Sequence, residues 1–482
     1  MHITVKRIDS SACADVRLPN EPFPLCGRML PAYDGQWSYT VTMLPPQERS
    51  EMVFPDEVYD FEAMAQDYIF IGAYTDDGVC VGLAVYRRSW NRYMYLHDLK
   101  VNAAYRRPGI GRRLLEEGKT DKECLAFLTE DYLVMPHKAA LALKVAKAER
   151  KILDNRPEEI SLYIGIPFCP TRCLYCSFTA YPLHQYKNRV DEYLDAMFRE
   201  LDWLAAYSRS FVMKNIYIGG GTPTSLNEAQ LERLLQKVEE LFHPDESMEY
   251  TVEAGRPDTI TREKLRLLKE YGVNRISINP QTMNDKTLRA VGRKHTVEDI
   301  RRVFREAREE GHQNINMDLI LGLPGEDAAD VRNTMEEIMK LAPDNVTMHT
   351  LAVKRASRLR EELAQHDMTT AEALEEMLDI SAEYAERMGM EPYYMYRQKN
   401  MVGNFENVGY CHPGKEGIYN VQIMEEKQTI LAAGAGASTK TVDPETDRIE
   451  RVFNVKSIED YIGRIEEMIE RKRTGLPQGG NI

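Results

Sequence analysis

The sequence contains no apolar run of the roughly 20 residues that a membrane-spanning helix needs. Its first residues, Met-His-Ile-Thr-Val-Lys, lack the basic and then apolar pattern of a secretory signal peptide. Basic residues are also in deficit, because 62 Lys and Arg stand against 76 Asp and Glu, for a formal net charge of −14. A broad surface for nucleic acid phosphates is therefore not expected. We expect a cytoplasmic protein with no membrane span and no nucleic acid partner.

Cysteine is scarce, with eight in 482 residues, and only three of the eight are close together. Cys169, Cys173 and Cys176 form a C-x3-C-x2-C pattern directly after an apolar run. In a reducing compartment such a group is typical of metal or cofactor binding rather than of disulfides. A structural zinc is one alternative, but it needs four closed ligands, and Ser177 and Phe178 follow instead of a fourth ligand. Three thiolates on a four-iron cluster would leave one iron open as a reaction site.

The chain divides by pattern into four segments. Residues 1–118 contain short strand-like runs, residues 119–156 read as a helical connector without glycine, and residues 157–353 alternate β-rich runs with amphipathic stretches. Residues 354–482 begin with a helical pattern, Ala371 to Met388, and close with another, Ile458 to Arg473. The N-terminal runs are Tyr68 to Tyr74, Val79 to Tyr86 and Tyr93 to Val101.

The third segment predicts six βα repeats, and hence an α/β fold with a parallel sheet and helices outside it. The sheet is either open or a partial (β/α)6 TIM-like barrel, followed by a C-terminal α+β accessory domain. The predicted strands are Ile160 to Ile166, Asn215 to Ile218, Glu249 to Glu253, Arg275 to Asn279, Asn314 to Leu321 and Val346 to Ala352. The predicted helices are Glu192 to Tyr207, Glu228 to Phe242, Arg262 to Tyr271, Val297 to Glu310 and Val331 to Leu341, with a capping box at Thr296 and Asp299.

Polar and glycine residues gather where these strands end, which is where a βα barrel assembles its active site. The segment Gly219-Gly220-Gly221-Thr222-Pro223 follows the second strand, and its glycines let backbone approach a ligand closely. Glu253 ends the third strand. Singly, a tight turn or a solvated carboxylate would explain each feature. Together they predict a binding site beside the cysteines.

The cysteine pattern, with an aromatic residue before its last member, resembles the radical S-adenosylmethionine (SAM) superfamily. The resemblance implies a [4Fe–4S] cluster on Cys169, Cys173 and Cys176, with SAM bound at the open iron. One electron would then cleave SAM to methionine and a 5′-deoxyadenosyl radical, and no catalytic group beyond the cluster and SAM is implied. The residues that match SAM-binding positions of the family are Tyr163, Tyr175, Gly220, Gly221, Thr222, Glu253, Gln281, Arg293 and Asp318.

Two stretches, Tyr163 to Cys169 and Asp318 to Gly325, resemble the oxygen-independent coproporphyrinogen III dehydrogenase group of HemZ type, over about residues 119–476. This implies a porphyrinogen substrate, whose two propionates are oxidatively decarboxylated to vinyl groups, and an electron donor such as flavodoxin or ferredoxin. Arg397 and Lys399 are candidates for neutralising substrate carboxylates. The tyrosine run from Tyr393 to Tyr396 reads equally as a strand packed on the barrel or as a porphyrin platform.

One position separates two functions on this scaffold. Established dehydrogenases of the group carry a fourth cysteine where this sequence has Phe178, and phenylalanine is shared there with haem chaperones. An enzyme of haem synthesis and a haem carrier therefore both stay open. The sequence does not indicate an oligomeric state.

The first segment resembles another family, the GNAT acetyltransferases, and among them the streptothricin acetyltransferases. Arg106, Gly109 and Gly111 match the R-x-x-G-x-G loop, whose backbone amides would face the phosphates of acetyl-CoA. The residues on which this resemblance rests also include Trp90 to Tyr93. Because the resemblance stops near Leu115, we expect an incomplete GNAT fragment joined within Leu114 to Gly118. N-acetyltransferase activity is a further alternative function.

Overall fold

The computed structural model describes residues 3–477 apart from 26, 34–36, 46, 48, 66, 89–93, 107–108, 117–120, 127, 130–133, 154–155, 179, 399–404 and 444–447. Trp90 to Tyr93 and Lys399 thus lie outside the described residues. The chain forms two compact units, Met1–Ala139 and Ala140–Ile482. In the described part of the chain, no helix has the length and apolar composition needed to cross a bilayer.

The first unit is built on a four-stranded antiparallel sheet in the order β1-β6-β7-β8. Helix α2 packs on this sheet through Ile110 and Leu114, and Gly82 of β7 allows the approach because a Cβ there would lie 3.0 Å from Leu114 Cδ1. Two strand pairs, β2 with β5 and β3 with β4, complete the unit. The bounds are β1 Ile3–Arg7, β2 Phe23–Leu25, β3 Gly27–Tyr33, β4 Trp37–Met43, β5 Ser50–Met52, α1 Phe61–Met64, β6 Tyr68–Thr75, β7 Cys80–Arg88, β8 Met94–Val101, α2 Ile110–Glu116 and α3 Asp121–Ala126.

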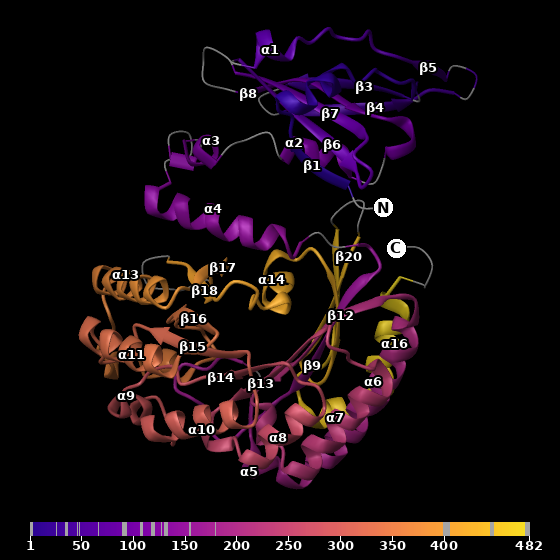
Figure 1. Ribbon diagram of the computed structural model, residues 1–482. Helices are drawn as coiled ribbons and strands as arrows, with labels where there is room; N and C mark the ends of the chain where they lie inside the picture. The colour runs from indigo at the N-terminus through magenta and orange to yellow at the C-terminus, as the bar shows by residue number, and fades with distance from the viewer. Residues whose placement is uncertain are drawn as a thin grey trace. The chain divides into compact units, whose positions relative to one another are not determined.

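The second unit contains one eleven-stranded sheet, and its six central strands run parallel in the order β16-β15-β14-β13-β12-β9. These are the six strands predicted from the sequence, which confirms the α/β fold. Their bounds are β9 Glu159–Ile166, β12 Val212–Gly220, β13 Glu249–Gly255, β14 Arg275–Ile278, β15 Ile315–Leu321 and β16 Asn345–Thr350. The sheet curves but does not close on itself, because β9 pairs with β19 and β16 pairs with β18 (Figure 1).

Helices cover the outer side of this curved sheet (Figure 1). In α10, the buried residues Val297, Ile300, Val303, Phe304 and Ala307 recur every three to four positions, so one stripe packs on the sheet and the charged remainder faces solvent. The predicted capping box is present, because the amide of Asp299 donates to Thr296 Oγ1 and that of Thr296 to the Asp299 carboxylate. The bounds are α6 Val190–Tyr207, α7 Glu228–Phe242, α8 Arg262–Glu270, α9 Asp285–Ala290, α10 Val297–Glu309 and α11 Ala328–Leu341.

Residues after 354 extend the same sheet at both edges. On one side β17 and β18 follow β16 in antiparallel register, and on the other β19 lies parallel to β9 and continues into β20 and β21. The predicted closing helix is two helices that meet at Arg464, next to Gly463, whose helix propensity is low. The remaining bounds are α4 Pro136–Arg150, α13 Ala371–Arg387, β17 Glu391–Tyr396, β18 Asn407–Cys411, α14 Ile418–Glu425, β19 Thr429–Ala433, β20 Ser438–Val442, β21 Ile449–Phe453, α15 Ile458–Gly463 and α16 Ile465–Gly475.

Candidate active site

A cavity of about 450 Å³ lies inside the curved sheet of the second unit. Its lining includes the three clustered cysteines and every residue that the sequence assigned to SAM binding, although these come from strands and loops spread over more than 150 positions of the chain. The structure thus places all of them around one space: Tyr163, Cys169, Cys173, Tyr175, Cys176, Gly220, Gly221, Thr222, Glu253, Gln281, Arg293 and Asp318.

Backbone hydrogen bonds hold the cysteine loop against the ends of neighbouring strands. The amide of Thr222 donates to the carbonyl of Phe168 at 2.8 Å, and the amide of Leu174 donates to that of Val291 at 3.0 Å. The Cys169 thiol lies 3.4 Å from the Thr222 hydroxyl, and Cys173 is buried. The loop is therefore fixed just before Cys169 by the glycine segment at the end of β12 and just after Cys173 by the turn after α9.

The glycine segment is needed for this contact. The backbone bends at Gly220, with φ of +111°, which favours glycine. At Gly221 a Cβ atom would lie 2.6 Å from the carbonyl oxygen of Phe168, which is too close for any side chain. The backbone at Gly221 and the backbone at Phe168 can therefore come into contact because no side chain lies between them.

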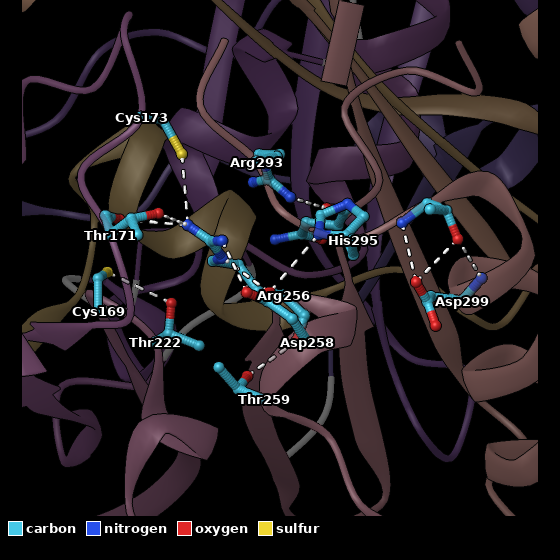
Figure 2. A network of polar contacts seen from close by, with 12 residues as sticks. Cys169, Thr171, Cys173, Thr222, Arg256, Asp258, Thr259, Arg293, His295 and Asp299 are labelled. Carbon is cyan, nitrogen blue, oxygen red and sulfur yellow. Dashed lines mark hydrogen bonds and ion pairs between the residues drawn. The ribbon is translucent and has the colours of Figure 1, made fainter. Parts of the chain in front are cut away.

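A buried arginine supports the cysteine loop, and sequence reasoning missed it. Arg256 donates through Nη1 to the carbonyl and the hydroxyl of Thr171, at 3.2 and 2.8 Å, and lies 3.8 Å from Cys173 Sγ (Figure 2). Asp258 holds the other side of the guanidinium in two hydrogen bonds of 2.9 and 2.8 Å. Arg256 thus ties the cysteine loop to the end of β13. Arg256 follows the third strand directly, and that position was the signal available in the sequence.

His295 completes this network, with Nδ1 3.5 Å from Asp258 (Figure 2). Burial by itself would raise the pKa of Asp258, but hydrogen bonds to His295 and Arg256 hold that pKa well below its ordinary value. Burial lowers the pKa of His295. Asp258 is thus a carboxylate that orients the arginine, rather than a group that exchanges protons.

The two carboxyl groups of the cavity differ in their protonation. Burial raises the pKa of Glu253 to about 7, and the charge of Asp318 adds to this, although the Tyr217 hydroxyl donates to Glu253 at 2.6 Å. Asp318 is also buried, but its pKa is lowered by the nearby imidazole of His349 and by a hydrogen bond from Asn316. The distances are 2.8 Å from Asn316 Nδ2 and 3.8 Å from His349 Nε2. Near neutral pH the cavity therefore holds one full carboxylate and one that is partly protonated.

We predict that Glu253→Gln stabilises the ligand-free protein in a pH-dependent way. Between pH 4.5 and about 7 native Glu253 keeps a proton that the unfolded chain has released, so stability falls as pH rises through this window. Glutamine carries no charge to bury. The variant should gain on the order of 2 kcal/mol in the free energy of unfolding at pH 8 and nothing at pH 4, in urea titrations. Glu246→Gln, at an exposed site, is the matched control, and an equal change in both variants would contradict this prediction.

Arg293 and Gln281 shape the wall next to the cysteines. Arg293 donates through Nη1 to the carbonyl of Asn279 at 2.7 Å and through Nε to the hydroxyl of Tyr175 at 3.3 Å. Gln281 has a φ of +72°, a left-handed conformation that is costly outside glycine. Two backbone hydrogen bonds to β15 hold it there, from its amide to Asp318 and from Ile320 to its carbonyl. Such strain is common where a side chain must point into a binding site.

The inner face of the sheet is polar along β14, β15 and β16, which the sequence analysis did not recognise. Arg275 and Ser277 of β14 and Asn279 directly after it line the cavity, while Ile276 and Ile278 between them pack in the apolar core. Asn316 and Asp318 alternate in the same way on β15, and His349 lines the cavity from β16. Polar residues at every second position of strands buried on both faces were the signal available, because a packed barrel interior would be apolar.

The predictions for the residues after 390 have different outcomes. The tyrosine run is the strand β17, and Tyr394 and Tyr396 line the cavity. Arg397 does not line it, because its guanidinium is paired with Glu406, so the proposed role in neutralising substrate carboxylates is not supported for Arg397. Glycines 434 and 436 adopt positive φ in a turn after β19, which brings Ala435 next to a second small space lined by Phe178 and Tyr163.

In the first unit, the arginine of the loop that matches acetyl-CoA binding donates hydrogen bonds to other residues of the same unit. Arg106 donates to the carbonyls of Val101, Glu21 and Pro22, at 2.8, 2.9 and 2.5 Å. Gly109 has a φ of +77°, and Gly111 lies in the first turn of α2. The loop thus has the conformation that glycines permit, while its arginine closes the loop against the N-terminal segment.

The donor set of the cysteine loop fits an iron–sulfur cluster. A cubane cluster takes one thiolate on each of three irons, and the three thiols border one cavity with Arg256 beside them. Within the described ranges, no three His, Cys, Asp or Glu side chains converge as ligands of a single metal ion would. Cys169, Cys173 and Cys176 would therefore hold the cluster, which would supply a site for SAM next to the cavity residues.

Both units match known protein families. The radical SAM superfamily matches residues 163–338, and the acetyltransferase (GNAT) family matches residues 33–129. The oxygen-independent coproporphyrinogen-III oxidase-like protein HemZ of Bacillus subtilis is 40% identical over 370 residues, which cover 76% of this chain and 74% of HemZ. Heme chaperone HemW of the same organism is 33% identical over 316 residues, or 64% of this chain and 76% of HemW.

The fold agrees with a solved relative. The structure of coproporphyrinogen III oxidase (HemN) from Escherichia coli superposes with a TM-score of 0.52 at 23% identity, covering 66% of this chain and 72% of that one. The larger unit is thus a radical SAM domain, and a GNAT domain precedes it. The chain belongs to the radical SAM family of oxygen-independent coproporphyrinogen III oxidase-like proteins, in which oxidases and heme chaperones both occur. Membership implies a [4Fe–4S] cluster and SAM.

Proposed function

We propose that this protein is an oxygen-independent coproporphyrinogen III dehydrogenase, which converts two propionate side chains of a porphyrinogen to vinyl groups. The observation that carries the proposal is that one cavity is lined both by the three cysteines and by the polar residues of β14 and β15. A substrate with several carboxylates would find hydrogen-bonding groups there in the same space as the cysteines.

When bound, the cluster and SAM supply a 5′-deoxyadenosyl radical, which can take a hydrogen atom from an unactivated carbon. The propionate would lose that hydrogen from its β-carbon. The bond to the carboxylate carbon would then break, and the alkene and CO2 would form once a one-electron oxidant takes the remaining electron. A protein electron donor such as flavodoxin or ferredoxin would reduce the cluster.

The residues of this chain position the reactants and exclude water. Glu253 and Asp318 offer acceptors for hydroxyl and amino groups of SAM, with Asp318 kept ionised by the nearby His349 and by a hydrogen bond from Asn316. Gly220 and Gly221 let the backbone approach SAM closely. The rings of Tyr163, Tyr217 and Tyr419 form a cluster in the cavity wall, with centroids 6.3 Å apart for Tyr163 and Tyr217, 4.2 Å for Tyr217 and Tyr419 and 6.1 Å for Tyr163 and Tyr419. These rings shield the reactive end of the cavity.

A haem carrier is the second candidate, and Phe178 favours it. The ring of Phe178 is 68% exposed at the rim of the cavity, and Lys354 Nζ lies 6.0 Å from its centroid. An exposed aromatic ring next to a cation could receive the flat face and a propionate of haem. This candidate shares the cluster and SAM site with the enzyme.

One anaerobic incubation tests the proposal. Reconstituted protein, SAM, dithionite and coproporphyrinogen III should yield protoporphyrinogen IX together with about two 5′-deoxyadenosine per product, because each propionate needs its own hydrogen abstraction. Chromatography of the oxidised porphyrins and of the nucleoside measures both. Protein without SAM is the control. Stoichiometric haem binding without any vinyl product would support the carrier instead.

A further inference from the structure

Arg275 is a buried cation that the site described above does not use. It is the first residue of β14, its side chain is 2% exposed, and it lines the same cavity as the cysteines. Its Nη2 donates to Asn345 Oδ1 at 3.2 Å and lies 3.5 Å from the hydroxyl of Tyr393. Its Nε is buried without a hydrogen-bond partner. Among the described residues, no carboxylate lies within ion-pair distance of this guanidinium.

The other buried arginine of this region differs in that respect. Arg256 is fully engaged by Asp258 and Thr171. The acid that acts on Arg275 from a neighbouring strand is Glu249, and its two oxygens accept the amides of Ile418 and Tyr419, at 2.6 and 3.1 Å, where α14 begins. A buried guanidinium costs free energy unless an anion compensates it. The protein's own side chains supply only part of that compensation.

The polar groups around Arg275 are already paired with one another. Ser277 donates to Asn279 at 2.6 Å and accepts from Asn316 at 2.9 Å, while Tyr217 donates to Glu253. Within the described chain, Arg275 therefore keeps one donor, Nε, without a partner and has no carboxylate beside it, while the stacked rings of Tyr217 and Tyr419 line the same cavity. An incompletely paired guanidinium in a cavity with aromatic walls matches a carboxylate carried on a molecule with aromatic rings.

The position along the strand sets the size of the ligand. Arg275 precedes Asn279 by four residues, and at about 3.3 Å per residue it lies about 13 Å deeper than the strand end. Arg293, which borders the cysteines, contacts the carbonyl of Asn279. A ligand that reaches both ends must extend over that depth, as a tetrapyrrole with carboxylates on opposite sides does and a small carboxylic acid does not.

We infer that Arg275 binds one carboxylate of a tetrapyrrole at the deep end of the cavity while another part of the macrocycle faces the cysteines. This inference rests on the proposed function for the identity of the substrate. The propionates of a porphyrinogen and of haem share the chemistry, so the carboxylate subsite would serve either function. Arg275 positions the ligand and takes no part in bond breaking.

Binding titrations of the full-length, cluster-loaded protein test this subsite. The probes are coproporphyrin III, its tetramethyl ester and haem, followed by fluorescence quenching or absorbance, for wild type, Arg275→Gln, Arg275→Lys and the exposed control Arg305→Gln. Arg275→Gln should weaken binding of coproporphyrin III by about 10- to 100-fold and that of the ester by less than about threefold. Arg275→Lys keeps the charge without the planar fork, so a loss of about 3- to 10-fold is expected. Arg305→Gln should match wild type.

The outcomes separate this inference from the proposed function. An equal loss for the acid and its ester in Arg275→Gln, or no loss for either, overturns the subsite, because a merely structural arginine would not sense esterification. Wild-type protein that binds neither coproporphyrin III nor haem also overturns it. If Arg275→Gln does not fold, the same comparison of acid and ester in Arg275→Lys decides. If Arg275→Gln weakens the binding of haem but not of coproporphyrin III, and the wild-type protein forms no vinyl product, the subsite is supported and the dehydrogenase function is refuted.

Discussion

Replacement of Cys169, Cys173 or Cys176 by alanine is expected to abolish cluster binding and SAM cleavage. Wild-type protein purified without oxygen should carry about four irons and a broad brown absorbance that SAM perturbs. Each variant should retain well under one iron, because two thiolates hold a cubane poorly. The rate of 5′-deoxyadenosine formation should fall on the order of 10³-fold or more, since no side chain can replace the radical source.

Iron analysis, absorbance and the nucleoside assay measure this effect. Cys13→Ser is the matched control, because Cys13 is exposed in the first unit, and its variant should keep wild-type iron and activity. A variant of Arg256, which removes a contact with Cys173 but none of the three thiols, should have an effect between those of Cys13→Ser and of the cluster cysteine variants. Stoichiometric zinc instead of iron, after expression with ample iron and without oxygen, would contradict the iron–sulfur interpretation.

The second large effect is expected for Gly221→Ala. The added methyl carbon would lie 2.6 Å from the carbonyl oxygen of Phe168 and 3.0 Å from the carbonyl carbon of Pro167. These are backbone atoms and cannot rotate away, so the segment that carries Cys169 must move. A displacement of about 1 Å at a reacting centre costs about 100-fold in rate. We expect SAM cleavage to fall by about that factor and the free energy of unfolding by about 1–3 kcal/mol.

The control is another glycine-to-alanine substitution with an open environment. Gly463 ends α15, has no heavy atom within 4 Å of a built Cβ, and does not need positive φ. Gly463→Ala should leave SAM cleavage unchanged. Rates within twofold of wild type for Gly221→Ala would show that the contact between the glycine segment and the cysteine loop is dispensable.

Much of the fold could be predicted because the central strands and helices have strong local signals. The helix predicted over Glu228 to Phe242 has those bounds in the structure, and its start is set by Asn227, whose side chain caps the third amide of the helix. The six central strands were predicted because each is a short apolar run between amphipathic stretches. The closing helix was predicted as one piece, since periodicity alone does not show the break next to Gly463.

The candidate site could be predicted in part for a topological reason. In a parallel sheet the carboxyl ends of all strands meet at one edge, so residues at strand ends must come together. Glu253 could therefore be placed in one site with Cys169 without any knowledge of distances, whereas Asp318, in the middle of β15, was assigned through the resemblance to the radical SAM superfamily. The residues that were missed act through contacts instead. Arg256 became visible only when its neighbours Asp258 and Thr171 were in place.

The sequence by itself determined the order of strands and helices, the three cysteines and the membership in two families, because these depend on local patterns and on spacing along the chain. Tertiary structure alone decided which charges are compensated. Arg275 looks like any arginine at the start of a strand, yet the fold buries it opposite Asn345, 70 positions away, with no carboxylate partner in the described chain. Its surroundings come from several strands, and burial is a property of the whole fold, so no local pattern encodes it.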